Sequence, residues 1–280
     1  MIIWLASYPK SGNTWLRFFI NSLLYAEVGK ADLINIANIK SFPKPEQFIN
    51  LVNNINDIKE ISENWTKAQS ILNLDKKIKF IKTHNMLCKL NGNFFTNLNN
   101  TLGTIYIVRD PRNVVNSIKH HFQLDTLEKA KDFITSENTI SGTKGTNQNP
   151  IPAIIGSWKT HYNSWKRFPK NLLILNYDKI LLNPNKEFLR VKKFLEKILK
   201  LKINKNKFNK SVENCEFEKL QKMEKLEGFV ESIIDKNSGK KKNFFNLGPK
   251  NDWKNFLDKK IKDKIENKFE KEMKELGYLE

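Results

Sequence analysis

The sequence predicts an α/β fold in which a central, mostly parallel sheet is flanked by helices in a three-layer structure. Four short apolar or β-branched segments have the length and composition of buried strands: Ile2–Ser7, Ile78–Thr83, Thr104–Val108 and Leu172–Asn176. Segments with helical periodicity separate them. Apolar strands that alternate with helices are typical of a parallel sheet covered on both faces. Such sheets bind ligands outside the carboxyl ends of their strands.

Composition and charge indicate a globular chain with an anionic partner. Of the 280 residues, 39% are hydrophobic and 28% are charged, and no repeat or linker divides them, so we expect one domain over residues 1–280. The 49 Lys and Arg residues against 30 Asp and Glu residues give a net charge of +19. This charge predicts attraction to nucleic acid, an acidic membrane, or a phosphorylated or sulfated small molecule. It does not select among them.

The predicted helices follow the strands in chain order. Apolar residues recur at helical spacing over Thr14–Tyr25, after the first strand, and over Pro111–Phe122, after the third. Ser41–Leu74 is predicted to form helices and loops over the sheet, and Asp125–Thr135 to form a further helix.

The rest of the chain divides into a polar loop and a helical C-terminal third. Ser136–Pro152 is polar and rich in helix-breaking residues, so we expect a mobile loop. The clearest amphipathic segments after it are Asn185–Leu199 and Asn255–Leu276. Lys and Glu are interleaved there, so we interpret much of the positive charge as a solvated helical surface.

Cysteine usage and hydropathy argue against a disulfide-rich, secreted or membrane-spanning protein. Cys88 and Cys215 exclude a disulfide framework, and the four histidines show no metal-ligand spacing around them. We therefore expect no metal. The N-terminal apolar run is too short for a signal peptide, and no window approaches the roughly 20 apolar residues of a membrane span. We expect a cytoplasmic protein.

The clearest functional signal follows the first predicted strand. The strand ends near Ser7, a turn containing Gly12 follows, and a helix begins near Asn13. Free backbone N–H groups and the positive end of the helix dipole would then surround an anion site. The segment is similar to a P-loop, but Ser7 and Asn13 stand where that template has its first glycine and its lysine. The lysine here is Lys10, before the glycine, which argues against an ordinary Mg-NTP hydrolase.

A second signal lies at the end of the third predicted strand. Asp110 can cap a helix there, and Pro111 suits its first turn. Arg109 stands at the strand end and Ser117 lies further along the same helix. A guanidinium and a hydroxyl can together bind a terminal phosphate.

A histidine follows the second predicted strand. His84 would stand at the carboxyl edge of the sheet, on the same side as the anion loop. A neutral imidazole can accept a proton from a hydroxyl near pH 7, although a histidine in this position is more often a structural residue. His120, His121 and His161 are interpreted as structural, with the first two as candidates to line an acceptor cleft.

These motifs resemble those of the sulfotransferases that use 3′-phosphoadenosine 5′-phosphosulfate (PAPS). Tyr8–Leu16 is similar to the family's 5′-phosphosulfate loop, Tyr106–Ser117 to its second signature, Lys82–His84 to a third, and Leu247–Lys254 to a weaker fourth. Order and spacing agree from residue 1 to about 277. The resemblance implies a P-loop-like α/β fold and transfer of a sulfuryl group from PAPS to a hydroxyl or amine, without a metal.

The resemblance also implies roles for individual residues. His84 is the implied base, and Lys10 and Lys82 are implied to neutralise the bridging oxygen of the leaving group. Trp15 and Phe217 are implied to enclose the adenine, although periodicity alone would make them core residues. The residues implied to bind the donor are Lys10, Ser11, Gly12, Asn13, Thr14, Trp15, Arg109, Ser117, Tyr177, Phe217, Asn246, Gly248 and Lys250.

The fourth motif departs from the family pattern of Arg-Lys-Gly, two variable residues, then Gly-Asp-Trp-Lys. Asn246 stands at the arginine, Leu247 at the lysine and Asn251 at the second glycine. Loss of the arginine is expected to weaken donor binding by about 1–3 kcal/mol. Lys250 or the run 240–242 could restore the charge.

Three other functions remain open at this stage. One is a P-loop kinase of small molecules. Another is a basic nucleic-acid-binding module, although no recognised nucleic-acid motif is present. The third is a protein that binds the donor without turnover. The acceptor, a small molecule or a carbohydrate, would meet Ile36–Leu74 and His120–Pro152, whose Asn and Thr residues favour a polar group.

Overall fold

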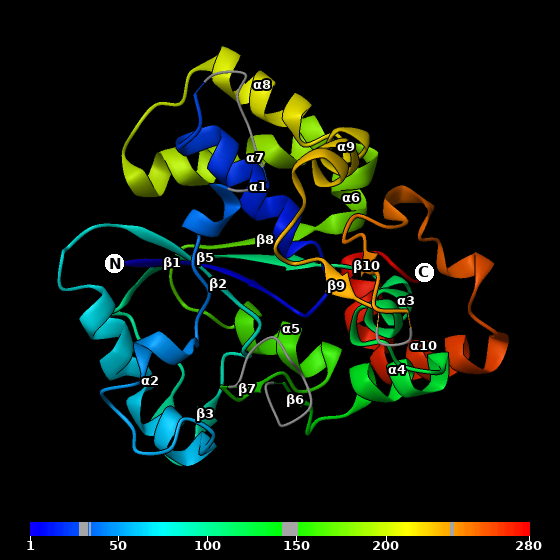
Figure 1. Cartoon of the computed structure of the whole chain (residues 1–280), viewed down its shortest axis with the longest axis horizontal. Coiled ribbons are helices and arrows are strands. Elements are labelled where there is room, and N and C mark those ends of the chain that lie inside the picture. The colour runs from blue at the N-terminus through cyan, green and yellow to red at the C-terminus, as the bar shows by residue number, and fades with distance from the viewer. Residues whose placement is uncertain (28–32, 34, 142–150, 236–237) are drawn as a thin grey trace.

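The computed structural model describes residues 1–280 apart from 28–32, 34, 142–150 and 236–237. At its centre lies a parallel sheet of four strands in the order β2-β1-β5-β8 (Figure 1). The strands are β1 (Ile2–Ser7), β2 (Lys79–Thr83), β5 (Thr101–Val108) and β8 (Leu172–Asn176). Helices cover the sheet, and the predicted fold class is confirmed.

The interior strand β1 divides the protein into two cores. Successive side chains of a strand point to opposite faces. Ile2 and Trp4 accordingly pack into one core, and Ile3 and Leu5 into the other. All six residues of β1 are buried, which explains why this segment is a continuous apolar run in the sequence.

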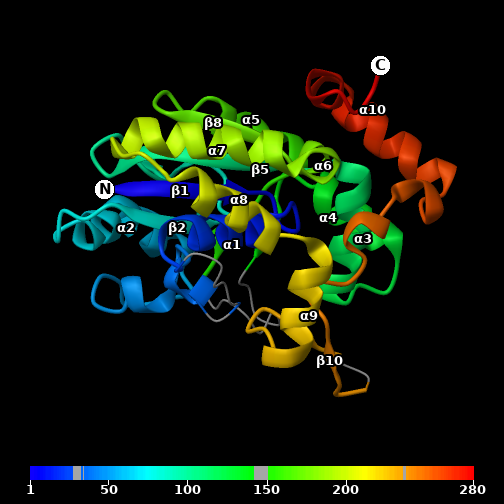
Figure 2. The same cartoon turned by 90° about the horizontal axis from the view of Figure 1, so that it is seen from above.

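Two groups of helices form the outer layers (Figures 1 and 2). On the face of Ile3 and Leu5 lie α1 (Asn13–Leu24), α7 (Pro184–Leu199) and α8 (Lys205–Asn214). On the opposite face lie α2 (Ile58–Leu72) and α5 (Trp158–Lys166). Among the described residues, no helix is both long enough and apolar enough to cross a membrane.

A further group of elements gathers beyond the carboxyl ends of the strands, at the right of Figure 1. These elements are α3 (Pro111–Phe122), α4 (Leu127–Thr135), α6 (Tyr177–Leu182), α9 (Phe217–Glu227), β9 (Ile233–Ile234), β10 (Lys241–Lys242) and α10 (Lys259–Leu276). The loop between β1 and α1 faces this group, which therefore surrounds the edge of the sheet where ligands are expected.

Several short elements were not predicted. They are the two-residue strands β3 (Lys89–Leu90), β4 (Asn93–Phe94), β6 (Ile140–Ser141), β7 (Ala153–Ile154), β9 and β10, and the 3₁₀ turns Asn35–Asn38, Pro45–Gln47, Gly248–Lys250 and Trp253–Asn255. A strand of two residues is too short to show a sequence period. The predicted mobile loop lies mainly outside the described residues, and β6 and β7 pair antiparallel at its two ends.

Candidate active site

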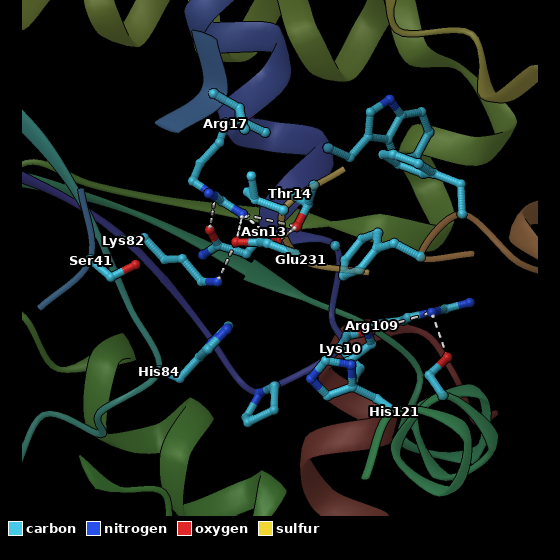
Figure 3. A pocket seen from close by; sticks show the side chains of 18 of the residues that line it. Lys10, Asn13, Thr14, Arg17, Ser41, Lys82, His84, Arg109, His121 and Glu231 are labelled. Atoms are coloured by element: carbon cyan, nitrogen blue, oxygen red, sulfur yellow. Dashed lines mark hydrogen bonds and ion pairs between the residues drawn. The ribbon is translucent and has the colours of Figure 1, made fainter. Parts of the chain in front are cut away.

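A cavity of about 680 Å³ lies at the carboxyl edge of the sheet. The loop between β1 and α1, the ends of β2 and β5, and the start of α6 border it (Figure 3). The predicted site residues that line it are Lys10, Gly12, Asn13, Thr14, Trp15, Lys82, His84, Arg109, Ser117, Tyr177, Phe217, Asn246 and Gly248. Of the other two predicted residues, Ser11 is fully buried, and Lys250 is exposed and outside the lining.

The loop between β1 and α1 has the geometry of an anion site. Gly12 has a φ of 101°, and a Cβ there would lie 2.4 Å from the ring of Tyr177, so the turn requires glycine. Within the described part of the chain, no acceptor binds the backbone N–H groups of residues 12–15, which comprise the N-cap and the first three residues of α1. In the part of the chain that the structure describes, the buried hydroxyl of Ser11 has no hydrogen-bond partner. Unpaired donors at a helix N-terminus suit a phosphate or sulfate group.

Two side chains of this segment are engaged by the protein itself. Asn13 donates from Nδ2 to the carbonyl oxygen of Leu5 at 2.8 Å and to Oγ of Ser7 at 3.2 Å, which ties the start of α1 to β1. Thr14 donates from its hydroxyl to Oε2 of Glu231 at 2.8 Å. Because these side chains already bind other residues, Asn13 and Thr14 would contact an anion through their backbone N–H groups.

Two lysines bring positive charge to the cavity. Nζ of Lys10 lies 4.0 Å from the centroid of the Phe244 ring, and Nζ of Lys82 lies 3.1 Å from Oε1 of Glu231. Burial lowers the pKa of Lys10 to about 7 and that of Lys82 to about 8, with the charge of Glu231 opposing both shifts. A bound anion would raise both pKa values because it favours the charged forms.

His84 is held in one tautomer. Its Nδ1 lies 2.9 Å from the carbonyl oxygen of Ser7. A carbonyl only accepts, so Nδ1 carries the proton and Nε2 is the proton-accepting nitrogen. Burial, followed by the charge of Lys82, holds the pKa of His84 well below its usual value. His161 is structural, as predicted: its Nε2 donates to the carbonyl oxygen of His84 at 3.0 Å.

The end of β5 and the start of α3 form a second group of donors. Asp110 caps α3 by accepting from the backbone N–H of Arg112 at 2.9 Å, as the sequence predicted. The Arg109 guanidinium lies 4.2 Å from the centroid of the Tyr177 ring and donates to Oγ of Ser117 at 3.3 Å. Nε of Arg109 is buried and has no hydrogen-bond partner among the described residues. This unpaired charged donor is available to an anion.

Aromatic rings stand beside these donors. Trp15 meets Tyr177 edge to face, with 5.4 Å between the ring centroids. Phe217 packs so closely on Gly248 that a Cβ there would lie 2.3 Å from the ring. Trp15 and Phe217 both line the cavity, so two aromatic faces are available to a planar ring system.

The segment that departs from the family pattern contacts Ser117 through a neutral side chain. Asn246 and Leu247 line the cavity without bringing charge, and Lys250 does not line it. Asn251 lies there instead, 6% exposed, and donates from Nδ2 to Oγ of Ser117 at 3.2 Å and to a backbone carbonyl of α3 at 2.9 Å. A neutral amide thus holds the hydroxyl that was expected to face a phosphate.

Sequence reasoning missed two charged residues of the site, Arg17 and Glu231. Nη2 of Arg17 lies 2.7 Å from Oε1 of Glu231. Figure 3 shows this carboxylate between Arg17 and Lys82. Arg17 lies within an apolar helical pattern, and no motif surrounds Glu231. Only the three-dimensional structure shows that Arg17 and Glu231 pair, because they are far apart in the sequence.

The remaining wall is formed by segments outside the main sheet. Residues between 36 and 46 and the end of α3 line this side. His120 and His121 are among them, as predicted. Burial, together with the positive charge of Lys10, lowers the pKa of His121 to about 3, so this imidazole is neutral. This wall combines apolar side chains with Lys40 and Lys44.

Comparison with known proteins assigns the chain to a family. A family model described as a sulfotransferase domain matches residues 2–277. The chain belongs to the sulfotransferase family. Its curated relatives include dog Sulfotransferase 1B1, 25% identical over 96% of this chain and 82% of that protein, and Cytosolic sulfotransferase 16 of Arabidopsis thaliana, 25% identical over 98% and 76%.

Solved sulfotransferase-like structures share the fold. Mouse sulfotransferase SULT7A1 complexed with PAP superposes with a TM-score of 0.60 at 22% identity, over 98% of this chain and 84% of that one. Retinol dehydratase in complex with androsterone and inactive cofactor PAP gives a TM-score of 0.61 at 18% identity, over 98% and 80%. At these identities the likeness concerns the architecture.

Proposed function

We propose that this sulfotransferase-family chain transfers the sulfuryl group of PAPS to an acceptor hydroxyl or amine. The observation that carries the proposal is one cavity with two separate groups of anion donors. The loop of residues 10–15 forms one group, and Arg109 with Ser117 forms the other. The aromatic faces of Trp15 and Phe217 line the same cavity. A nucleotide with charged groups at both ends matches this arrangement.

The residues present suit both ends of such a donor. The free N–H groups of residues 12–15 and the unpaired Ser11 hydroxyl suit the 5′-phosphosulfate, and the unpaired Nε of Arg109 suits the 3′-phosphate. Trp15 and Phe217 would hold the adenine. In this scheme Tyr177 supports the site, since its ring packs on both Trp15 and Arg109.

His84 would act as the general base. Nε2 takes the proton of the acceptor hydroxyl as the acceptor oxygen forms a bond to sulfur. The bond between sulfur and the bridging oxygen breaks, and its electron pair stays on the 5′-phosphate of the product, adenosine 3′,5′-bisphosphate. Lys10 and Lys82 stabilise this developing charge. Holding the donor and the acceptor in line for the reaction supplies much of the rate enhancement. The scheme uses no metal.

Transfer of radiolabel tests the proposal. We expect the wild type to move ³⁵S from PAPS to at least one member of a panel of phenols, sugars and amines. His84→Ala is expected to lower transfer about 100- to 10,000-fold, the usual contribution of a general base. Its affinity for adenosine 3′,5′-bisphosphate, measured by calorimetry, should change little. Equal sulfuryl transfer by the wild type and by His84→Ala would show that His84 is not the general base.

The same experiments separate the other functions. Tight Mg-ATP binding that PAPS cannot displace would indicate a kinase, although the P-loop lysine position is occupied by Asn13, which is buried and bound to β1. Nucleotide affinity without any turnover would indicate a donor-binding protein. Specific nucleic-acid binding that survives physiological salt would indicate a nucleic-acid-binding module. We propose one functional domain over residues 1–280, acting in the cytoplasm on a small molecule or carbohydrate.

A further inference from the structure

Glu231 is a carboxylate at the centre of a group of donors. It accepts from the Thr14 hydroxyl at 2.8 Å, from Nη2 of Arg17 at 2.7 Å and from Nζ of Lys82 at 3.1 Å. Its side chain is 22% exposed and that of Arg17 is 3% exposed. Thr14 and Arg17 belong to α1 and Lys82 to β2, so one carboxylate connects two elements of the central fold.

Glu231 itself belongs to a segment that covers the cavity. We call this segment the donor cover; it comprises residues 228–235 and 238–248. Val230, Phe244, Phe245 and Gly248 of the donor cover line the cavity. The ring of Phe244 lies 4.0 Å from Nζ of Lys10. The donor cover therefore contributes one wall of the nucleotide site.

A second carboxylate holds the donor cover from the other side. Glu224 of α9 accepts from the backbone N–H groups of Phe244 and Phe245 at 2.6 and 2.9 Å and from the hydroxyl of Ser232. These bonds attach the donor cover to α9. Among the described residues, the side-chain hydrogen bonds that attach the donor cover to α1 and β2 are those of Glu231.

We infer that Glu231 is a positioning residue that holds the donor cover closed over the bound nucleotide and keeps Lys82 directed toward its 5′ end. The inference rests on the function proposed above. Arg17 has no part in donor binding in that proposal, and its guanidinium is committed to Glu231 and to the side chains of Asn13 and Thr14. The ion pair of Arg17 with Glu231 can therefore persist while the nucleotide is bound.

A competing interpretation is that Glu231 imitates a phosphate. Its carboxylate would then occupy the place of the 5′-phosphosulfate and would have to leave before the donor binds. The two interpretations differ in the rate constants that they predict. A positioning residue slows nucleotide dissociation, because the closed donor cover retains the ligand. A competing carboxylate slows nucleotide association and leaves dissociation unchanged.

The dissociation rate of adenosine 3′,5′-bisphosphate tests the inference. Labelled nucleotide is bound to the full chain and chased with unlabelled nucleotide, with rapid filtration as the readout. We expect dissociation from Glu231→Gln to be about tenfold faster than from the wild type, a change of about 1.4 kcal/mol. Glu231→Asp, which keeps the charge, should restore part of the retention. A wild-type rate in Glu231→Gln would overturn the inference.

A matched control distinguishes an effect of the position of Glu231 from the general effect of losing one negative charge. Glu227→Gln removes the same charge from an exposed residue at the end of α9 and should dissociate at the wild-type rate. Equal acceleration by both variants would contradict the inference. If Glu231→Gln does not fold, Glu231→Asp is compared with wild type, and an unchanged rate is again a contradiction. A wild type that binds no nucleotide would instead reject the proposed function.

Discussion

Lys10 and Lys82 are residues whose charge state depends on what occupies the cavity. Burial lowers their pKa values to about 7 and about 8, so near neutral pH part of the free protein carries an uncharged amine in the site. Bound phosphate groups favour the ammonium forms. Nucleotide binding and proton uptake are therefore linked.

This linkage predicts how affinity depends on pH. Free Lys10 and Lys82 lose their protons as the pH rises from 7 to 9, so the affinity for adenosine 3′,5′-bisphosphate should fall over this range. At pH 8 binding should take up between about one and one and a half protons, measured by calorimetry in buffers of different ionisation enthalpy. Lys10→Met should lose most of this uptake. Binding at pH 8 without proton uptake would contradict the assigned pKa values.

Residues at strand ends could be predicted, but their distant partners could not. His84 and Arg109 each follow a strand directly, and Lys10 stands three residues after the end of another, so local patterns place them at one edge of a parallel sheet. The partner of Thr14 is 217 residues away along the chain. Local periodicity carries no information about such a contact. The tautomer of His84 likewise depends on the carbonyl of Ser7, which only the fold brings within 2.9 Å.

At the scale of elements, the C-terminal segment is joined to α3 through asparagine amides. Asn251 donates to Ser117 and to a backbone carbonyl of α3, and Asn116 donates to Oδ1 of Asn251 at 2.9 Å. Trp253 donates from its backbone N–H to Oδ1 of Asn113 at 2.8 Å. These bonds join the C-terminal segment, whose motif lacks the family's arginine, to the Ser117 hydroxyl that we propose binds the 3′-phosphate.

This connection predicts a loss that is specific to the 3′-phosphate. Asn251→Ala leaves the Ser117 hydroxyl without its amide donor and should weaken binding of adenosine 3′,5′-bisphosphate about three- to tenfold, the range of one hydrogen bond. Binding of AMP, which lacks the 3′-phosphate, should be unaffected when both ligands are titrated by calorimetry. Asn255→Ala, at an exposed position of the next turn, is the matched control. An equal loss for AMP would mean that Asn251 supports the site in general.

Long elements were predicted more closely than short ones. The four main strands each place apolar side chains in both cores, because both faces of the sheet are covered. The ends of the helices depend on capping contacts that the apolar pattern does not contain. α10 begins at Lys259 because Asp258 caps it by accepting from the N–H of Ile261 at 2.8 Å, whereas the pattern alone suggested a start at Asn255.

At the scale of the whole molecule, the net charge of +19 has two components. A small part lies in the cavity, where Lys10, Lys82 and Arg109 stand. A larger part lies on exposed helical surfaces such as that of α10. Water and salt screen exposed charges beyond a distance of about 8 Å at physiological ionic strength. The surface excess therefore contributes little to nucleotide affinity at physiological ionic strength.

Neutralising part of the exposed positive charge of α10 tests whether surface lysines contribute to nucleotide affinity. Replacing Lys260, Lys268 and Lys271, all exposed on α10, by glutamine lowers the net charge from 19 to 16. The affinity for adenosine 3′,5′-bisphosphate at 0.15 M salt should change less than about twofold, since these charges are screened. Lys10→Met alone should cost far more. A large loss in the triple variant would mean that the surface lysines act on the site.

The two walls of the cavity are built differently, and this matters for how the protein could be redesigned. The wall proposed to hold the nucleotide combines the donor cover with the ends of strands that are anchored in both cores, whereas the opposite wall consists of 3₁₀ turns, two-residue strands and a helix end outside the main sheet. Loop substitutions are tolerated better than changes in a packed sheet. Residues 36–46 and 120–122 are therefore the places to exchange when a new acceptor is wanted, with the donor half left intact.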